Sequence, residues 1–195
     1  MKLCAVSPFT NTSEAEIVAF LSDSTAALVL LPGRSRNTPS PEKVQSAIRS
    51  SVSVFVEGKG KKKEATPYLV TSRRIMSMPR QIFCQRPTAQ QLDDLVACLP
   101  SRTFAIGSRM VTFFICGELI AFNPDGSVKH GRQLPYDILA NPSHTIMGHW
   151  NHLGKKLSSL SLRSAAIYTT NNDRNHSGIL TGLSPIRASN RRNIM

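Results

Sequence analysis

The stretch Phe113-Phe114-Ile115-Cys116-Gly117-Glu118-Leu119-Ile120 decides the fold of this 195-residue chain. An apolar run typical of a buried strand ends in Cys116-Gly117, and a carboxylate follows at Glu118. A strand that ends in Cys-Gly can present its thiol at a sheet edge, where the next backbone N–H groups can face an incoming carbonyl. This layout is typical of a cysteine nucleophile. The alternative is that Cys116 packs in the core, as most small hydrophobic side chains do.

Strands and helices alternate on both sides of this stretch. Apolar or alternating runs predict strands at 1–7, 26–31, 51–56, 68–72, 104–109, 111–116, 136–140 and 165–170. Capping residues and three-to-four spacing predict helices that open within 11–16 and that cover 41–49, 88–99 and 146–161. Asn141-Pro142 is expected to close the strand at 136–140. The class is therefore α/β with a mixed sheet, as one domain over 1–186 and a frayed basic tail at 187–195.

Composition excludes several other classes. Hydrophobic residues make up 41% of the chain and charged residues 18%, as in ordinary globular proteins. No apolar run reaches the roughly 18 residues that a membrane helix needs, and the first apolar segment is too short for a signal peptide. We therefore expect a cytoplasmic protein with reduced cysteines. The four cysteines and five histidines lack the spacing of metal ligands, so neither a metal nor a cofactor is expected.

The net charge of +12 is the unusual bulk property. Basic residues gather in the Gly-Lys turn around Lys61 and in the tail around Arg191. The positive electrostatic potential of such a surface attracts nucleic acid or an anionic surface. Lys61 and Arg191 are therefore candidate contacts for such a partner. The alternative is an ordinary solvated basic face.

Several motifs occur in an order that resembles the carbon-nitrogen hydrolase (nitrilase/amidase) superfamily. They are Leu30-Leu31-Pro32, Met78-Pro79-Arg80-Gln81-Ile82-Phe83, Ile115-Cys116-Gly117-Glu118-Leu119, Leu139-Ala140-Asn141-Pro142-Ser143 and Ile167-Tyr168-Thr169-Thr170-Asn171. The resemblance spans most of the chain and implies a four-layer α-β-β-α sandwich, truncated at its C-terminus. It also implies a homodimer formed through the sheet-covering helices, and a small amide or nitrile ligand.

The resemblance further implies a site built from a glutamate base, a lysine and a cysteine nucleophile. Cys116 matches the nucleophile. Gly33 stands where the glutamate is usual, and Arg80 stands where the lysine is usual. An arginine keeps the positive charge but stays protonated, so Arg80 can steady an oxyanion and cannot act as a base. The chain therefore resembles a degenerate member of the superfamily.

Two carboxylates are candidates for a replacement base. Glu118 follows Cys116 closely, and the alternative for it is a structural residue that orients the loop. Glu57 precedes the Gly-Lys turn and is placed in the binding region together with Asn141. The main hypothesis is a binding or interaction module without standard hydrolase activity, a pseudoenzyme. The alternatives are a cysteine-dependent amidohydrolase or acyltransferase of altered mechanism, and a nucleic-acid or anionic-surface binding protein.

Overall fold

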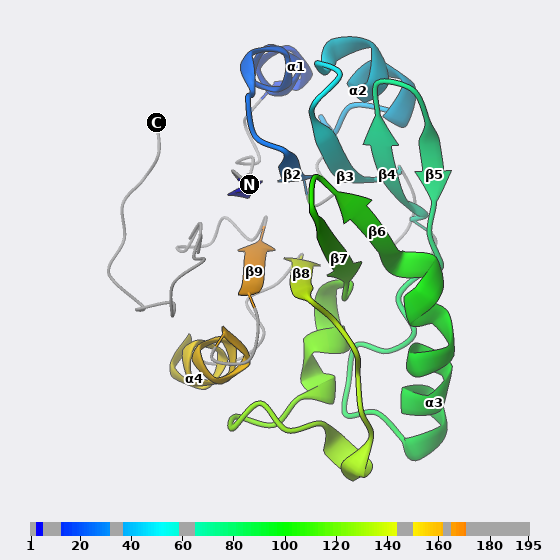
Figure 1. Ribbon diagram of the computed structural model, residues 1–195, viewed down its shortest axis with the longest axis vertical. Helices are drawn as coiled ribbons and strands as arrows, with labels where there is room; N and C mark the ends of the chain where they lie inside the picture. Colours follow the sequence, from blue (N-terminus) through cyan, green and yellow to red (C-terminus); the bar gives the residue numbers. More distant parts are fainter. Residues whose placement is uncertain are drawn as a thin grey trace.

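The computed structural model describes residues 3–5, 13–31, 37–58, 65–143, 150–161 and 165–170. Two sheets form its centre, and the helices lie at the two ends of the view in Figure 1. Gly33, Lys61 and Arg191 lie outside the described residues, as does the whole tail at 187–195. No helix of the described part is long and apolar enough to cross a membrane.

The first sheet has the strand order β1-β2-β3-β4-β5. Its strands are β1 (Leu3–Ala5), β2 (Leu28–Leu31), β3 (Ser53–Glu57), β4 (Pro67–Thr71) and β5 (Ile75–Ser77). The first three strands run parallel, and β3, β4 and β5 continue as antiparallel neighbours. All four residues of β2 are buried, as the lack of alternation in its sequence predicts for a strand covered on both faces.

The second sheet has the strand order β6-β7-β8-β9. Its strands are β6 (Thr103–Ile106), β7 (Arg109–Phe113), β8 (Ile138–Ser143) and β9 (Ala165–Thr170). The first pair is a tight antiparallel hairpin, and β7, β8 and β9 are parallel.

Four α-helices and three short 3-10 helices accompany the sheets in the described residues. They are α1 (Glu14–Asp23), α2 (Pro41–Ala47), α3 (Ala89–Cys98), α4 (Trp150–Ser161), η1 (Leu99–Arg102), η2 (Cys116–Ala121) and η3 (Lys129–Gly131). Capping boxes at Ser13 and Thr88 fix the starts of α1 and α3, because each side chain accepts the N–H of the third helical residue.

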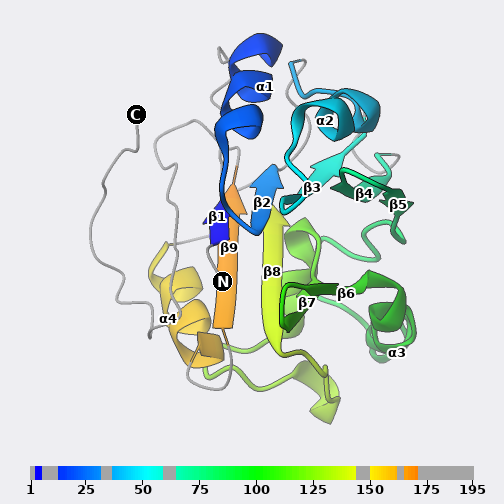
Figure 2. The same cartoon turned by 45° about the horizontal axis from the view of Figure 1, so that its top comes forward.

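Three apolar clusters hold these elements together. Between the sheets, Phe55 of β3 stacks on Phe113 of β7, with ring centroids 5.3 Å apart. The opposite face of the first sheet packs against α1 and α2 through Ile17, Leu21 and Val44. The third cluster holds leucines of α3, α4 and β8, so these helices lie at the other end from α1 and α2 (Figure 2).

Three predicted strand ends are wrong. The strand predicted for 104–109 ends at Ile106, and Arg109 already belongs to β7. The strand predicted for 111–116 ends at Phe113, because β7 pairs with β8 only as far as Ala140. The predicted strand at 136–140 instead runs on through Pro142 to Ser143 in register with β9. Since β7 has ended by then, this part of β8 lacks a partner on that side, where the missing N–H of a proline is tolerated.

Candidate functional site

Cys116 lies three residues after Phe113, the end of β7, and is the first residue of η2. Its φ angle is +47°, in the left-handed region that non-glycine residues rarely adopt. The side chain is 6% exposed. The chain thus leaves the strand, turns sharply at the cysteine and enters a helical turn. A strained residue of this kind is often found where a side chain must be presented in a fixed direction.

Gly117 makes this turn possible. A Cβ atom at residue 117 would lie 2.6 Å from the Cα atom of Cys84 and 3.0 Å from Nε2 of Gln81. Only a glycine permits the backbone of the Cys116 turn to approach the segment around Cys84 so closely. The glycine that follows Cys116 is therefore required for steric reasons, as well as being part of the motif.

Glu118 is completely buried and its carboxylate is fully engaged. Oε1 accepts the N–H of Ile82 at 2.7 Å, and Oε2 accepts the N–H of Ile115 at 2.7 Å. Oε2 also accepts Nη1 of Arg102 at 2.5 Å. Burial raises the pKa of the Glu118 carboxyl, and the Arg102 guanidinium and the two N–H groups oppose that rise. These contacts favour the orienting role over the role of a base, because the carboxylate already accepts three donors.

Arg102 is one of the residues at this site that the sequence analysis missed. Its side chain is as inaccessible to solvent as that of Glu118, and Nη2 donates to the backbone carbonyl of Arg80. Arg102 thereby joins the Cys116 turn to the segment that carries Arg80. The position of Arg102, between a predicted helix and a predicted strand, is visible in the sequence. Nothing in the neighbouring residues indicates that its partner is Glu118.

Asn141 holds the turn from the side of β8. Its Nδ2 donates to the carbonyl oxygens of Phe114 and Cys116, at 2.5 Å and 3.1 Å. Ser143, two residues along the same face of β8, places its hydroxyl 3.8 Å from Sγ of Cys116. Both side chains are completely buried. Asn141 was predicted as a binding residue and contacts the backbone of the nucleophile turn, whereas Ser143, which contacts the thiol, was not singled out.

Arg80 and Glu57 both lie near the end of β3, away from the Cys116 turn in sequence. Glu57 is the last residue of β3, is 4% exposed, and points to the same side as Phe55 because side chains alternate along a strand. Phe55 stacks on Phe113, so this side faces the second sheet. The exposed Arg80 directs Nη2 to the hydroxyl of Thr66 at 3.4 Å. Thr66 accepts the N–H of Gly58, which places the Arg80 guanidinium at the same strand end as Glu57.

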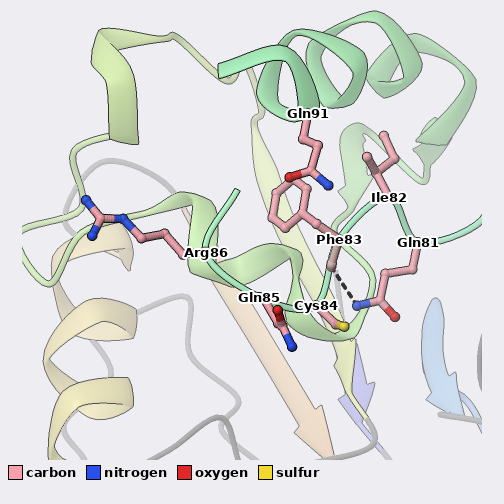
Figure 3. A pocket seen from close by; sticks show the side chains of 7 residues that line it. All are labelled: Gln81, Ile82, Phe83, Cys84, Gln85, Arg86 and Gln91. Carbon is pink, nitrogen blue, oxygen red and sulfur yellow. Dashed lines mark hydrogen bonds between the residues drawn. The ribbon is translucent and has the colours of Figure 1, made fainter. Parts of the chain in front are cut away.

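A cavity of about 290 Å³ opens beside the turn, where Gln81 and Cys84 lie close to Gly117. It is lined by Gln81, Ile82, Phe83, Cys84, Gln85, Arg86 and Gln91 (Figure 3). Gln81 donates from Nε2 to the carbonyl of Phe83 at 2.7 Å, which ties the wall together. Cys84 is exposed there, in contrast to the buried Cys116. The described residues contain no group of three His, Cys, Asp or Glu side chains that could hold a metal ion.

No protein-family model and no curated protein matches the chain. Solved structures do match. A glutamine-dependent NAD+ synthetase from Acinetobacter baumannii matches with a TM-score of 0.53 and 10% identity, over 83% of this chain and 35% of the synthetase. This chain thus spans about a third of the synthetase's length.

Two further matches have lower TM-scores. A CN-hydrolase superfamily protein from Xanthomonas campestris, with an arsenic adduct in its active site, has a TM-score of 0.45 and 12% identity, over 81% of this chain and 69% of that one. An amidase from Nesterenkonia sp. AN1 has a TM-score of 0.49 and 11% identity, over 87% and 76%. The matched proteins are of the kind that the sequence resemblance predicts, and at 10–12% identity the likeness concerns the fold alone.

Proposed function

We propose that the protein is a degenerate carbon-nitrogen hydrolase that serves as a binding or interaction module, with Cys116 held in place but without standard amide or nitrile hydrolysis. One observation carries this proposal. The carboxylate nearest to Cys116 in sequence, Glu118, is fully buried and accepts three donors. It cannot collect a thiol proton without giving up the Arg102 pair. The sequence also has Gly33 where the resemblance implies the base.

The finer architecture belongs to the same proposal. We take the chain as a four-layer α-β-β-α sandwich. Support comes from the three separate apolar clusters, one between the sheets and one on each outer face.

The test compares the wild-type chain with Cys116→Ala on a panel of small amides and nitriles, with ammonia release as the readout. We expect equal, background rates. Loss of a general base alone costs about 10²–10⁴ in rate. Turnover that depends on Cys116 and clearly exceeds the variant's would overturn the proposal.

A second candidate is a cysteine-dependent amidohydrolase or acyltransferase of altered mechanism. Two observations favour it: the left-handed backbone at Cys116 and the position of Glu57 on the face toward the second sheet. In this reaction the thiol proton passes to the Glu57 carboxylate while sulfur bonds to the amide carbon. The C–N bond then breaks and the amine leaves with that proton. Water next attacks the thioester, gives its proton to Glu57 and releases the acid together with the free thiol.

Iodoacetamide labelling across pH distinguishes the two candidates. An activated thiol reacts well below the ordinary cysteine pKa near 8.5. If Glu57 is the base, Glu57→Gln slows labelling of Cys116 at pH 7 and leaves labelling of the exposed Cys84 unchanged. Equal labelling of Cys116 in both proteins would count against the altered mechanism.

A further inference from the structure

Three cationic side chains stand on separate segments that the fold brings together near η2. They are Arg86 in the loop before α3, Lys129 at the start of η3 and Lys156 in α4. Burial, and then the charge of Lys129, lowers the pKa of Lys156 to about 8. Burial, and then the charge of Arg86, lowers the pKa of Lys129. Each cation is therefore close enough to repel the next.

Hydrogen bonds next to each cation hold the three segments together. Lys156 donates from Nζ to the carbonyl of Leu119 at 3.2 Å. His130, in the left-handed region with φ +54°, places Nε2 3.3 Å from the carbonyl of Pro87, the neighbour of Arg86. Ser159, one turn after Lys156, donates to the carbonyl of Pro124 at 2.9 Å. The like charges are thus held near one another by the fold itself.

No carboxylate forms an ion pair with any of the three cations in the part of the chain that the structure describes. The ion pairs there join Lys43 to Glu14, Arg102 to Glu118, Arg109 to Asp137 and Arg132 to Asp93. Both carboxylate oxygens of Asp93 in α3 already accept the guanidinium of Arg132.

We propose that Arg86, Lys129 and Lys156 form a binding site for a phosphate group. A planar guanidinium can bind two phosphate oxygens side by side, and two ammonium groups supply further donors to a dianion. Of the three donors of Lys156, the described part of the structure shows one in use, on the carbonyl of Leu119. The side chain of Arg86 extends away from Cys84 and Gln85, on the side of the view where α4 lies (Figure 3).

The cavity that Arg86 borders sets the size of the rest of the ligand. Its volume of about 290 Å³ is at the small end of ligand pockets, and three glutamine side chains line it. A small phosphorylated molecule would fit with its polar body against Gln81, Gln85 and Gln91. The phosphate of a nucleic-acid backbone offers the same charged group without such a body.

The experiment titrates the full chain with inorganic phosphate, replacing chloride at constant ionic strength, and follows binding by calorimetry. We expect saturable binding that weakens at least tenfold in Arg86→Gln and in Lys156→Gln. Lys43→Gln removes the same charge from an exposed lysine of α2 and should leave the affinity unchanged. Circular dichroism checks that each variant is folded, and Arg86 is exposed, so its replacement should not disturb packing.

A second arm separates the two sources of phosphate. A short single-stranded oligodeoxynucleotide replaces inorganic phosphate, with fluorescence anisotropy as the readout. Binding that falls in the same two variants assigns the site to a nucleic-acid backbone, and binding of free phosphate alone assigns it to a small ligand. Phosphate binding that is absent, or equally strong in all the variants, together with no variant-dependent binding of the oligonucleotide, would overturn the proposal.

Discussion

Arg102 and Glu118 form an ion pair whose side chains are both completely buried, with Nη1 and Oε2 2.5 Å apart. The pair lies directly behind the nucleophile turn. Through it, the Cys116 loop, the carbonyl of Arg80 and the N–H of Ile82 become one hydrogen-bonded unit. A buried ion pair costs much desolvation, so it adds little net stability while both partners are present. Its effect here is to fix one geometry of the turn.

Removing one partner of the Arg102–Glu118 pair should strongly lower the stability of the protein. We expect Arg102→Ala to lower the free energy of unfolding by about 3–5 kcal/mol, because Glu118 would keep a buried, unpaired charge. Arg109→Ala is the matched control, since Arg109 pairs with Asp137 at the surface, where such pairs contribute at most about 1 kcal/mol. Urea unfolding measures both. Similar losses in the two variants would show that the buried pair has no special role.

Gly117→Ala should disturb the same turn sterically. The new methyl group would lie 2.6 Å from the Cα atom of Cys84, which is backbone and cannot rotate away. We expect a loss of about 1–3 kcal/mol in the free energy of unfolding. In Gly58→Ala the methyl would instead meet the ring of Tyr68 at 3.2 Å, and that ring can shift. If Gly58→Ala proves as costly as Gly117→Ala, the close approach at Gly117 is not what constrains the turn.

The predictions from sequence succeed where the signal is local. The helix predicted to open within 11–16 begins after Ser13, and the helix predicted for 88–99 begins after Thr88. Each start is set by contacts within one turn, because the cap side chain accepts the N–H of a residue only three positions later. The last strand was predicted with the bounds of β9, Ala165–Thr170, which its apolar run defines by itself. The ends of β7 and β8 were wrong, because which residues pair depends on neighbours far away in the chain.

The candidate site also has a part that the local sequence predicts and a part that it does not. Cys116-Gly117 predicts a sharp turn, and the turn is present. The contacts of Glu118 are with Arg102, 16 residues earlier, and with Ile82, 36 residues earlier, and no periodicity reveals such partners. The role of Glu118 as a replacement base stays a prediction, and its contacts favour the orienting alternative.

Replacing Asn141 should test how the turn is held from β8. Asn141→Ala removes the donor to the carbonyls of Phe114 and Cys116, and we expect a loss of about 1–3 kcal/mol. Asn141→Asp has nearly the same shape but points a carboxylate at the same two oxygens. At pH 7 it should be the less stable of the two variants, as measured by urea unfolding. The reverse order would mean that the amide is not oriented as described.

The lowered pKa of Lys156 predicts a pH dependence of stability. Between its folded value of about 8 and the ordinary value of 10.5, the unfolded chain binds more protons at this lysine than the folded chain does. The contribution of Lys156 to the free energy of unfolding therefore rises as the pH increases through this window. Subtracting the unfolding free energies of Lys156→Met from those of the wild type cancels the other titrating groups. This difference should grow from pH 7.5 to pH 10, and a flat difference would rule out a perturbed Lys156.

The backbone of Cys116 gives the most direct test of the turn. At an ordinary buried position, glycine is less stable than alanine by roughly 0.5–1 kcal/mol, because it loses more entropy on folding. At φ +47° the order should reverse, since a residue with a Cβ pays roughly 1–2 kcal/mol for the left-handed conformation and glycine pays almost nothing. We therefore expect Cys116→Gly to be at least as stable as Cys116→Ala in urea unfolding. Both variants remove the thiol, so the comparison isolates the backbone. A Cys116→Gly protein that is less stable than Cys116→Ala by the ordinary margin would show that the turn does not hold Cys116 in the left-handed region.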